Sequence, residues 1–438
     1  MTNILDFNRG SDFVYGKPYN PMPVEGAIAI PGTGKTREWR KRVAAPLVAL
    51  GLHPALAIPR HQLGEEIVAD FAEDGITAVC YRGREADDPL APGHKMCREQ
   101  RRIASVGEAL ADVYRHACKR GDKVCRYFEI CGYQRQQREH PQVSIFAHQM
   151  LFQKRPDFIQ PPDALGIDES FWDAGLRGHN KGKPERLWTS LLKDDRHVPG
   201  DIAGTADLVA ISNRAHAMLL RAPPGYIRRE AIVEAGITLK DVQAARQLEW
   251  RRKKDIPKVF PDMPVEQVHG ICGAVAAHNE DVRRLAIFWD LLAKTLEGDA
   301  ERSPYLYFNL VERTGLTGSD TQPAVRMIWR ADIHPSWKAP TTVMDATMSP
   351  SIVQQFYPTM PDPEPISVET PHTFVRQIVD RPMSANMLTR QKTKAKGEQT
   401  RDNHVLDVQR FIETRANGMQ PGRVLVICQK ELRAILDD

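Results

Sequence analysis

The chain has 438 residues, which is long for a single domain and predicts two or three. Its 42% hydrophobic and 26% charged residues are typical of a globular protein and exclude a largely disordered one. No apolar run reaches the roughly 20 residues that span a bilayer, and the first residues do not resemble a signal peptide, so we expect a cytoplasmic protein. The net charge of +4 is compatible with a nucleic-acid partner and does not require one.

Short apolar runs alternate with helical patterns along the first third of the chain. The predicted strands are residues 26–30, 54–59, 77–81, 142–146 and 164–167, and the predicted helices are residues 37–50 and 62–73. Strands that alternate with helices in this way predict a parallel, doubly wound sheet of the α/β class.

A glycine-rich turn follows the first predicted strand. Residues 29–36 read AIPGTGKT, which differs from the pattern G-x-x-x-x-G-K-[ST] only at its first position. Glycines let the backbone curl until its N–H groups converge on phosphate oxygens, the lysine places positive charge on the β- and γ-phosphates, and the hydroxyl ligates Mg²⁺. The predicted ATP-binding residues are Pro31, Gly32, Thr33, Gly34, Lys35 and Thr36.

Two acidic residues follow the predicted strand at 164–167. Asp168 is expected to hold Mg²⁺ together with Thr36, and Glu169 to orient the attacking water as a general base. The predicted catalytic set is therefore Lys35, Asp168 and Glu169.

A charged stretch at about residues 84–140 interrupts the alternation and contains four cysteines, Cys97, Cys118, Cys125 and Cys131. Four thiolates can bind one Zn²⁺ or the corners of a [4Fe–4S] cluster. The spacing lacks the short C-x2–4-C pairs of zinc knuckles and favours the larger cluster, with zinc as the alternative. A helix is expected at residues 105–120.

The remainder of the chain is predicted to be more varied. Residues 175–335 read as mostly helical, and a strand at 341–344 precedes Asp345, Ala346 and Thr347. A loop is expected at 358–365, a polar hinge at 392–401 and a strand at 423–428. The basic runs 251–254 and 390–401 are weak indications of nucleic-acid binding.

The order of these parts resembles the XPD/DinG-like branch of superfamily 2 DNA helicases over most of the chain. The phosphate loop resembles motif I, residues 57–63 (AIPRHQL) resemble motif Ia, and the cysteines stand where the family carries its iron–sulfur domain. Residues 143–151 (VSIFAHQML) resemble the strand before motif II, and Asp168-Glu169-Ser170-Phe171 stands in place of an Asp-Glu-Ala-His box. Residues 343–350 (VMDATMSP) resemble motif III, and 423–432 (RVLVICQKEL) resemble the first strand of a second RecA-like lobe.

The resemblance implies a RecA-like P-loop NTPase that couples ATP hydrolysis to movement along single-stranded or forked DNA. Asp345, Ala346 and Thr347 would take part in that coupling. The implied divisions are a first lobe at 1–83 and 141–174, a four-Cys metal insertion at 84–140, a helical arch-like insertion at 175–335, a return to the first lobe at 336–390, and the start of a truncated second lobe at 391–438.

The chain also departs from the family. Ser170 and Phe171 replace Ala and His, at a position that couples hydrolysis to movement. The family's motifs V and VI, which include the arginine finger, have no counterpart here. Since such an arginine contributes about 10³–10⁵ in rate in other NTPases, we expect this chain alone to bind ATP better than it hydrolyses it. A missing C-terminal half or a second chain would then supply the second lobe.

Two other functions remain open. A non-motor nucleic-acid-binding protein would use the nucleotide and the metal as structural ligands. A small-molecule kinase is favoured less, because it would not explain the cysteine insertion. Four aromatic residues, Phe128, Tyr133, Phe171 and Trp172, are candidates for base stacking, although such residues are more often part of a core.

Overall fold

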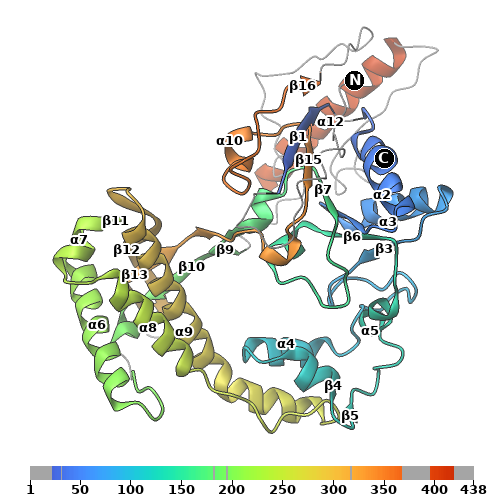
Figure 1. The fold of residues 1–438 in the computed structure, drawn as a ribbon. Helices are drawn as coiled ribbons and strands as arrows, with labels where there is room; N and C mark the ends of the chain where they lie inside the picture. The colour runs from blue at the N-terminus through green and yellow to red at the C-terminus, as the bar shows by residue number, and fades with distance from the viewer. Residues whose placement is uncertain are drawn as a thin grey trace. The chain divides into compact units, whose positions relative to one another are not determined.

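The structure, a computed structural model, describes residues 22–30, 32–180, 183–193, 196–315, 318–366 and 395–418. The chain divides into two units, Met1–Val368 and Glu369–Asp438. Figure 1 shows the elements of both units along the chain, and each unit is described by itself below.

A seven-stranded sheet forms the centre of the first part of unit 1 (Figure 1). Its strands are β1 (Val24–Ala29), β2 (Pro54–Ile58), β3 (Ala78–Tyr81), β6 (Val143–Ala147), β7 (Ala164–Asp168), β15 (Thr341–Asp345) and β16 (Pro365–Ile366). Their order is β16-β1-β15-β7-β2-β6-β3, and every neighbouring pair is parallel. The predicted parallel sheet is confirmed, with each predicted strand within about two residues of an observed one.

Both faces of this sheet are buried. Neighbouring residues of a strand point to opposite faces, so each strand contributes side chains to a cluster on either side. Leu56 and Ile58 of β2 pack with Trp39 and Phe71 on one face. Ala55 and Ala57, also of β2, belong to a second cluster on the other face. Continuous apolar strands of this kind are typical of parallel sheets, which explains why the sequence predicted them well.

Helices follow the first two strands. After β1, α1 (Lys35–Trp39), the π-helical turn η2 (Arg40–Ala44) and α2 (Ala45–Ala49) run one after another, and α3 (His61–Glu73) follows β2. Both predicted helices are therefore present.

The cysteine-bearing insertion lies between β3 and β6. Its elements are α4 (Gln100–Glu108), η3 (Tyr114–Cys118), β4 (Lys119–Arg120), β5 (Lys123–Val124), α5 (Gly132–Arg135) and η4 (Gln136–Arg138). The single helix expected at 105–120 is wrong. The helix α4 ends at Glu108, and Leu110 then adopts a left-handed backbone conformation with φ of 53°.

The region expected to be mostly helical contains helices and a second sheet. The helices are α6 (Ile202–Arg221), α7 (Arg229–Glu234), α8 (Leu239–Arg251) and α9 (Val265–Glu297). The sheet has the order β11-β12-β13-β10-β9, formed by β9 (His179–Asn180), β10 (Lys183–Trp188), β11 (Gly225–Arg228), β12 (Arg302–Gly315) and β13 (Gly318–Met327). The helical expectation missed this sheet, because its strands are buried on one face only and carry polar residues at alternate positions.

Short elements connect these parts. They are η5 (His148–Phe152), η6 (Trp172–Gly175), β8 (Leu176–Arg177), η7 (Thr189–Leu192), β14 (Trp329–Arg330), η8 (Pro335–Trp337) and α10 (Pro350–Val353). Within the described part of the chain, no helix combines the length and the apolar character needed to cross a membrane.

The described part of unit 2 is one helix, α12 (Ala395–Gly418). It covers most of the stretch that was expected to be a polar hinge, so that expectation is wrong from Ala395 onward. The strand predicted at residues 423–428 lies outside the described residues.

Candidate nucleotide site

The glycine-rich turn between β1 and α1 has a backbone that few residues other than glycine adopt. Gly32 and Gly34 have φ angles of 82° and 79°, in the left-handed region. The Thr33 hydroxyl donates to the Ile30 carbonyl oxygen at 2.8 Å. The Glu38 N–H donates to the Gly34 carbonyl oxygen at 2.8 Å and begins the helical run. Pro31, the remaining predicted loop residue, lies outside the described residues.

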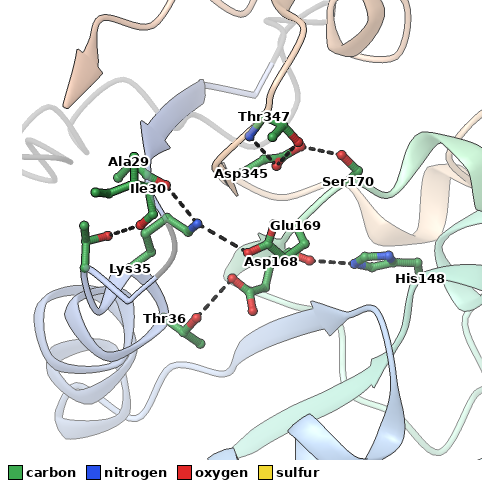
Figure 2. A network of polar contacts seen from close by, with 11 residues as sticks. Ala29, Ile30, Lys35, Thr36, His148, Asp168, Glu169, Ser170, Asp345 and Thr347 are labelled. Carbon is green, nitrogen blue, oxygen red and sulfur yellow. Dashed lines mark hydrogen bonds and ion pairs between the residues drawn. The ribbon is translucent and has the colours of Figure 1, made fainter. Parts of the chain in front are cut away.

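The turn places Lys35 and Thr36 against the two acidic residues at the end of β7 (Figure 2). The Thr36 hydroxyl donates to Asp168 Oδ1 at 3.0 Å. Lys35 Nζ lies 3.3 Å from Glu169 Oε1 and donates to the Ala29 carbonyl oxygen at 3.0 Å. These four residues, predicted from two motifs more than a hundred positions apart, thus lie together at the carboxyl ends of parallel strands, where open α/β sheets bind ligands.

Asp168 is the most strongly perturbed of these groups. It is 3% exposed, and burial raises the pKa of its carboxyl group to about 6. The Thr36 hydrogen bond and Lys35 lower that pKa, and the neighbouring Glu169 and Asp345 carboxylates raise it. A bound cation would therefore stabilise the ionised form of Asp168. The hydroxyl and carboxylate oxygens here are the hard donors that Mg²⁺ prefers, so the residues present fit that ion.

Glu169 has a left-handed backbone, with φ of 63°, which is uncommon for a residue other than glycine. Its N–H donates to the Met344 carbonyl oxygen of β15 at 2.7 Å. His148 Nε2 donates to the Asp168 carbonyl oxygen at 2.8 Å, from the turn after β6. Strained residues of this kind cost about 1–3 kcal/mol and persist where surrounding contacts hold them.

The sequence did not predict that His148 and the Met344 carbonyl contact the acidic pair. A histidine next to a strand end is a faint signal, and a backbone carbonyl leaves no signal in a sequence.

The residues that resemble motif III lie beside the acidic pair (Figure 2). The Ser170 hydroxyl donates to Asp345 Oδ2. Asp345 Oδ1 accepts from the Thr347 N–H at 2.9 Å and from its hydroxyl at 3.2 Å. Ala346 lies between Asp345 and Thr347 and has no polar side-chain atom. The ends of β7 and β15 are therefore joined by side chains as well as by the sheet.

Two cavities adjoin these elements. One of about 780 Å³ is lined by the phosphate-loop residues, Asp168 and Glu169, and by Pro59, Arg60 and Leu63. Its volume falls within the range of small-molecule and cofactor sites. A second, of about 990 Å³, lies between the cysteine insertion and the sheet, with Arg82, Arg84, Tyr133 and Lys154 in its lining.

The four predicted cluster cysteines lie near one another in the cysteine insertion. The Cys131 thiol donates to the Met96 carbonyl oxygen at 3.3 Å. Interaction between the Cys97 and Cys131 thiols is the largest cause that raises the pKa of Cys97 and lowers that of Cys131 to about 6. Burial raises the pKa values of Cys118 and Cys125. Arg84 opposes this effect at Cys118, a hydrogen bond from the Tyr127 backbone opposes it at Cys125, and neighbouring cysteines add a smaller increase. None of the six described cysteines forms a disulfide. Across the described ranges, however, no three His, Cys, Asp or Glu side chains are arranged as a metal site.

The stacking candidates divide between core and half-buried positions. Phe171 is fully buried and packs against Phe152, Phe356 and Tyr357, so its ring belongs to the core, the more frequent case for such residues, and is not available to a base. Tyr133 is half-buried and lines the larger cavity, with the Arg84 guanidinium 3.9 Å from its ring centroid.

No family model matches the chain, and no curated protein matches it. Among solved structures, the chain is similar to "Truncated XPD", with 12% identity, a TM-score of 0.34 and coverage of 79% of this chain and 96% of that one. It is also similar to "Structure of S. tokodaii Xpd4", with 10% identity, a TM-score of 0.29 and coverage of 90% of this chain and 64% of that one. Both TM-scores are below 0.5.

Proposed function

We propose that the chain is the nucleotide-binding part of a helicase-type, ATP-dependent motor that acts on single-stranded or forked DNA. The contact of Lys35 and Thr36 with Asp168 and Glu169 carries this proposal. A basic residue and a hydroxyl facing two carboxylates, beside a glycine-rich turn, are the groups that hold a nucleoside triphosphate with Mg²⁺.

Each of these side chains has a separate role in the proposal. Lys35 Nζ, now between Glu169 and a backbone carbonyl, moves onto the β- and γ-phosphates when ATP binds. Thr36 and Asp168 hold Mg²⁺, which neutralises charge on the phosphates. Glu169, released from Lys35, orients the attacking water.

The larger cavity supports a nucleic-acid substrate. Arg82, Arg84 and Lys154 line it together with Glu85 and Glu108, and Arg84 lies over the Tyr133 ring. Arg82 also pairs with Glu65, and Lys154 with Asp157. A groove with cations and aromatic rings suits single strands, whose phosphates and base faces are both accessible. Contacts of this kind are weakly sequence-specific and weaken with salt.

ATP hydrolysis with and without single-stranded DNA tests the proposal. We expect the parent chain to bind ATP and to hydrolyse it slowly, with turnover that single-stranded DNA increases. Lys35→Ala should lose that turnover, and Lys41→Ala, which removes an exposed lysine from the same helical run, should retain it. ATP binding without turnover, whether DNA is present or not, would favour a structural nucleotide in a non-motor binding protein. Absence of ATP binding would overturn the proposed site.

We also propose that Cys97, Cys118, Cys125 and Cys131 hold a metal group, either a [4Fe–4S] cluster or Zn²⁺. Their proximity supports this, as does Arg84, whose Nη1 lies 3.3 Å from Cys118 Sγ and would offset the negative charge of thiolates. Such a group would cross-link an insertion that has few hydrophobic residues of its own.

A further inference from the structure

One row of side chains crosses four strands of the antiparallel sheet in unit 1. Tyr226 of β11 is paired with Tyr307 of β12, Tyr307 with Arg326 of β13, and Arg326 with Arg186 of β10. Residues paired in this way lie on one face of a sheet. We call Tyr226, Tyr307, Arg326 and Arg186 the cross-strand row.

The row lies on the face that points away from the helices. The residues next to it in each strand, Ile227, Phe308, Val325 and Leu187, are buried in the core that the sheet shares with α6, α8 and α9. Because side chains alternate along a strand, the cross-strand row occupies the opposite face. Tyr226 is 46% exposed, Arg186 is exposed, and Tyr307 and Arg326 are half-buried.

Neighbouring side chains of the row contact one another, so its rings and cations form a strip. The rings of Tyr226 and Tyr307 meet edge-on, with centroids 5.1 Å apart and planes at 87°. The Arg326 guanidinium carbon lies 5.2 Å from the Tyr307 centroid. The strip is therefore an aromatic pair followed by two guanidinium groups.

No carboxylate of the described residues pairs with Arg326 or Arg186, and Arg326 Nε has no hydrogen-bond acceptor there. Glu185, next to Arg186, faces the helices, where it pairs with Arg283 and Arg284 of α9. The paired positions two residues along the same face carry Asn309, Ala324 and Trp188, none of them acidic. Around the cross-strand row, this face therefore combines positive charge with aromatic rings, and these neighbouring positions carry no carboxylate.

We propose that this face binds single-stranded nucleic acid, with a base stacked on Tyr226 and phosphates held by Arg186 and Arg326. Exposed rings stack on any base, and arginine both binds phosphate and stacks on bases, whereas a duplex hides its base faces. The substrate class is that of the proposed function, on which this inference rests. The surface is a second contact, formed by residues outside the nucleotide site and outside the cavity that contains Tyr133.

Binding of a fluorescent oligothymidylate to the full chain, measured by anisotropy without ATP, tests the inference. Tyr226→Ser should weaken binding about tenfold, the loss typical of one stacked base, and Tyr226→Phe should bind like the parent. Arg186→Gln should lower the slope of log affinity against log salt by about 0.7, the value for one phosphate contact on a single strand. Arg221→Gln removes an exposed arginine from α6 and should leave that slope unchanged.

A direct readout separates this surface from any other DNA contact. An oligonucleotide with 5-iododeoxyuridine should photo-cross-link to Tyr226 or Tyr307, and Arg186→Gln should reduce the yield. Parent-like binding and slope in Tyr226→Ser and Arg186→Gln would overturn the inference, and so would an equal loss of affinity for duplex DNA.

The ATP-hydrolysis test gives an independent answer. Cross-linking at Tyr226 in a chain that does not hydrolyse ATP would support the proposed single-strand-binding surface and contradict the proposed motor function. DNA-stimulated turnover with parent-like binding in the row variants would keep the motor and reject this surface.

Discussion

At the scale of single residues, one hydrogen bond joins the two strand ends that carry the acidic groups. Ser170, directly after Glu169, donates to Asp345, and Asp345 is close enough to Asp168 to raise its pKa. Removal of the Ser170 hydroxyl would leave an Asp345 oxygen without that donor. An acceptor left unpaired in this way costs about 1–3 kcal/mol, which a shift of the acidic loop could relieve.

We therefore expect Ser170→Ala to lower kcat for DNA-stimulated ATP hydrolysis about tenfold and to change KM little, because Ser170 would position Glu169 and not contact ATP. The reciprocal double variant Ser170→Asp with Asp345→Ser should recover part of kcat, since it restores the pair with donor and acceptor exchanged. Steady-state kinetics of these variants provide the measurement. Ser349→Ala is the control, because it removes only an exposed hydrogen bond between the Ser349 and Ser351 hydroxyls. A change confined to KM would contradict a positioning role.

Sequence motifs located most of the candidate nucleotide site because nucleotide binding requires particular residue types at fixed spacing. Lys35 and Thr36 follow a glycine pattern, and Asp168 and Glu169 follow an apolar strand, so both pairs could be predicted. The left-handed Glu169 backbone could not, since it is held by the Met344 carbonyl and by neighbours from other strands. The Ser170–Asp345 contact spans 175 positions and depends on the sheet order.

At the scale of elements, the parallel sheet could be predicted from the sequence and the antiparallel sheet could not. Strands buried on both faces give apolar runs, and those of the parallel sheet were predicted within about two residues, except the exposed edge strand β16, which was missed where a loop was expected. β12 and β13 bury one face, so that Leu306 and Phe308 alternate with Tyr305 and Tyr307, and the pattern was not recognised. Close packing between elements is also invisible in a sequence, as at Gly64 of α3. A Cβ there would lie 2.5 Å from Cys80 Sγ and 2.6 Å from Ile58 Cδ1.

Gly64→Ala should therefore destabilise the chain by about 1–2 kcal/mol, because overpacking outweighs the gain in helix propensity. Gly107→Ala in α4 is a matched control: its Cβ would meet nothing within 4 Å, and it should be neutral or stabilising. Urea unfolding of both variants gives the comparison. Cys80→Ala should restore part of the stability of Gly64→Ala, because it removes the contact with the sulfur and leaves the contact with Ile58 Cδ1. An unchanged midpoint for Gly64→Ala would show that α3 shifts away from β3 without cost.

At the scale of unit 1, the cysteine insertion and the start of α9 share one hydrophobic cluster. Cys97, Ile103 and Cys131 of the insertion belong to it, together with Val268 and Cys272 of α9. Hydrogen bonds reinforce the contact. Asn279 Nδ2 donates to the Ala109 carbonyl oxygen at 2.8 Å, His116 Nδ1 to the Val259 carbonyl oxygen at 3.0 Å, and Arg102 Nη2 to the Met263 carbonyl oxygen at 2.6 Å. Order in the insertion should therefore be coupled to order in residues 253–279.

Loss of the proposed metal group should increase hydrogen exchange both in the insertion and in residues 253–279. We expect protein purified without oxygen to contain about four irons, or one zinc, per chain, and Cys131→Ser to lose them. Hydrogen exchange in Cys131→Ser should then rise in α4 and in residues 253–279, and stay unchanged in β1 and β2, whose core is separate. Cys80→Ser, which changes a cysteine of the parallel sheet, should keep the metal. Protein without iron or zinc would refute the metal proposal, and faster exchange limited to the insertion would refute the coupling.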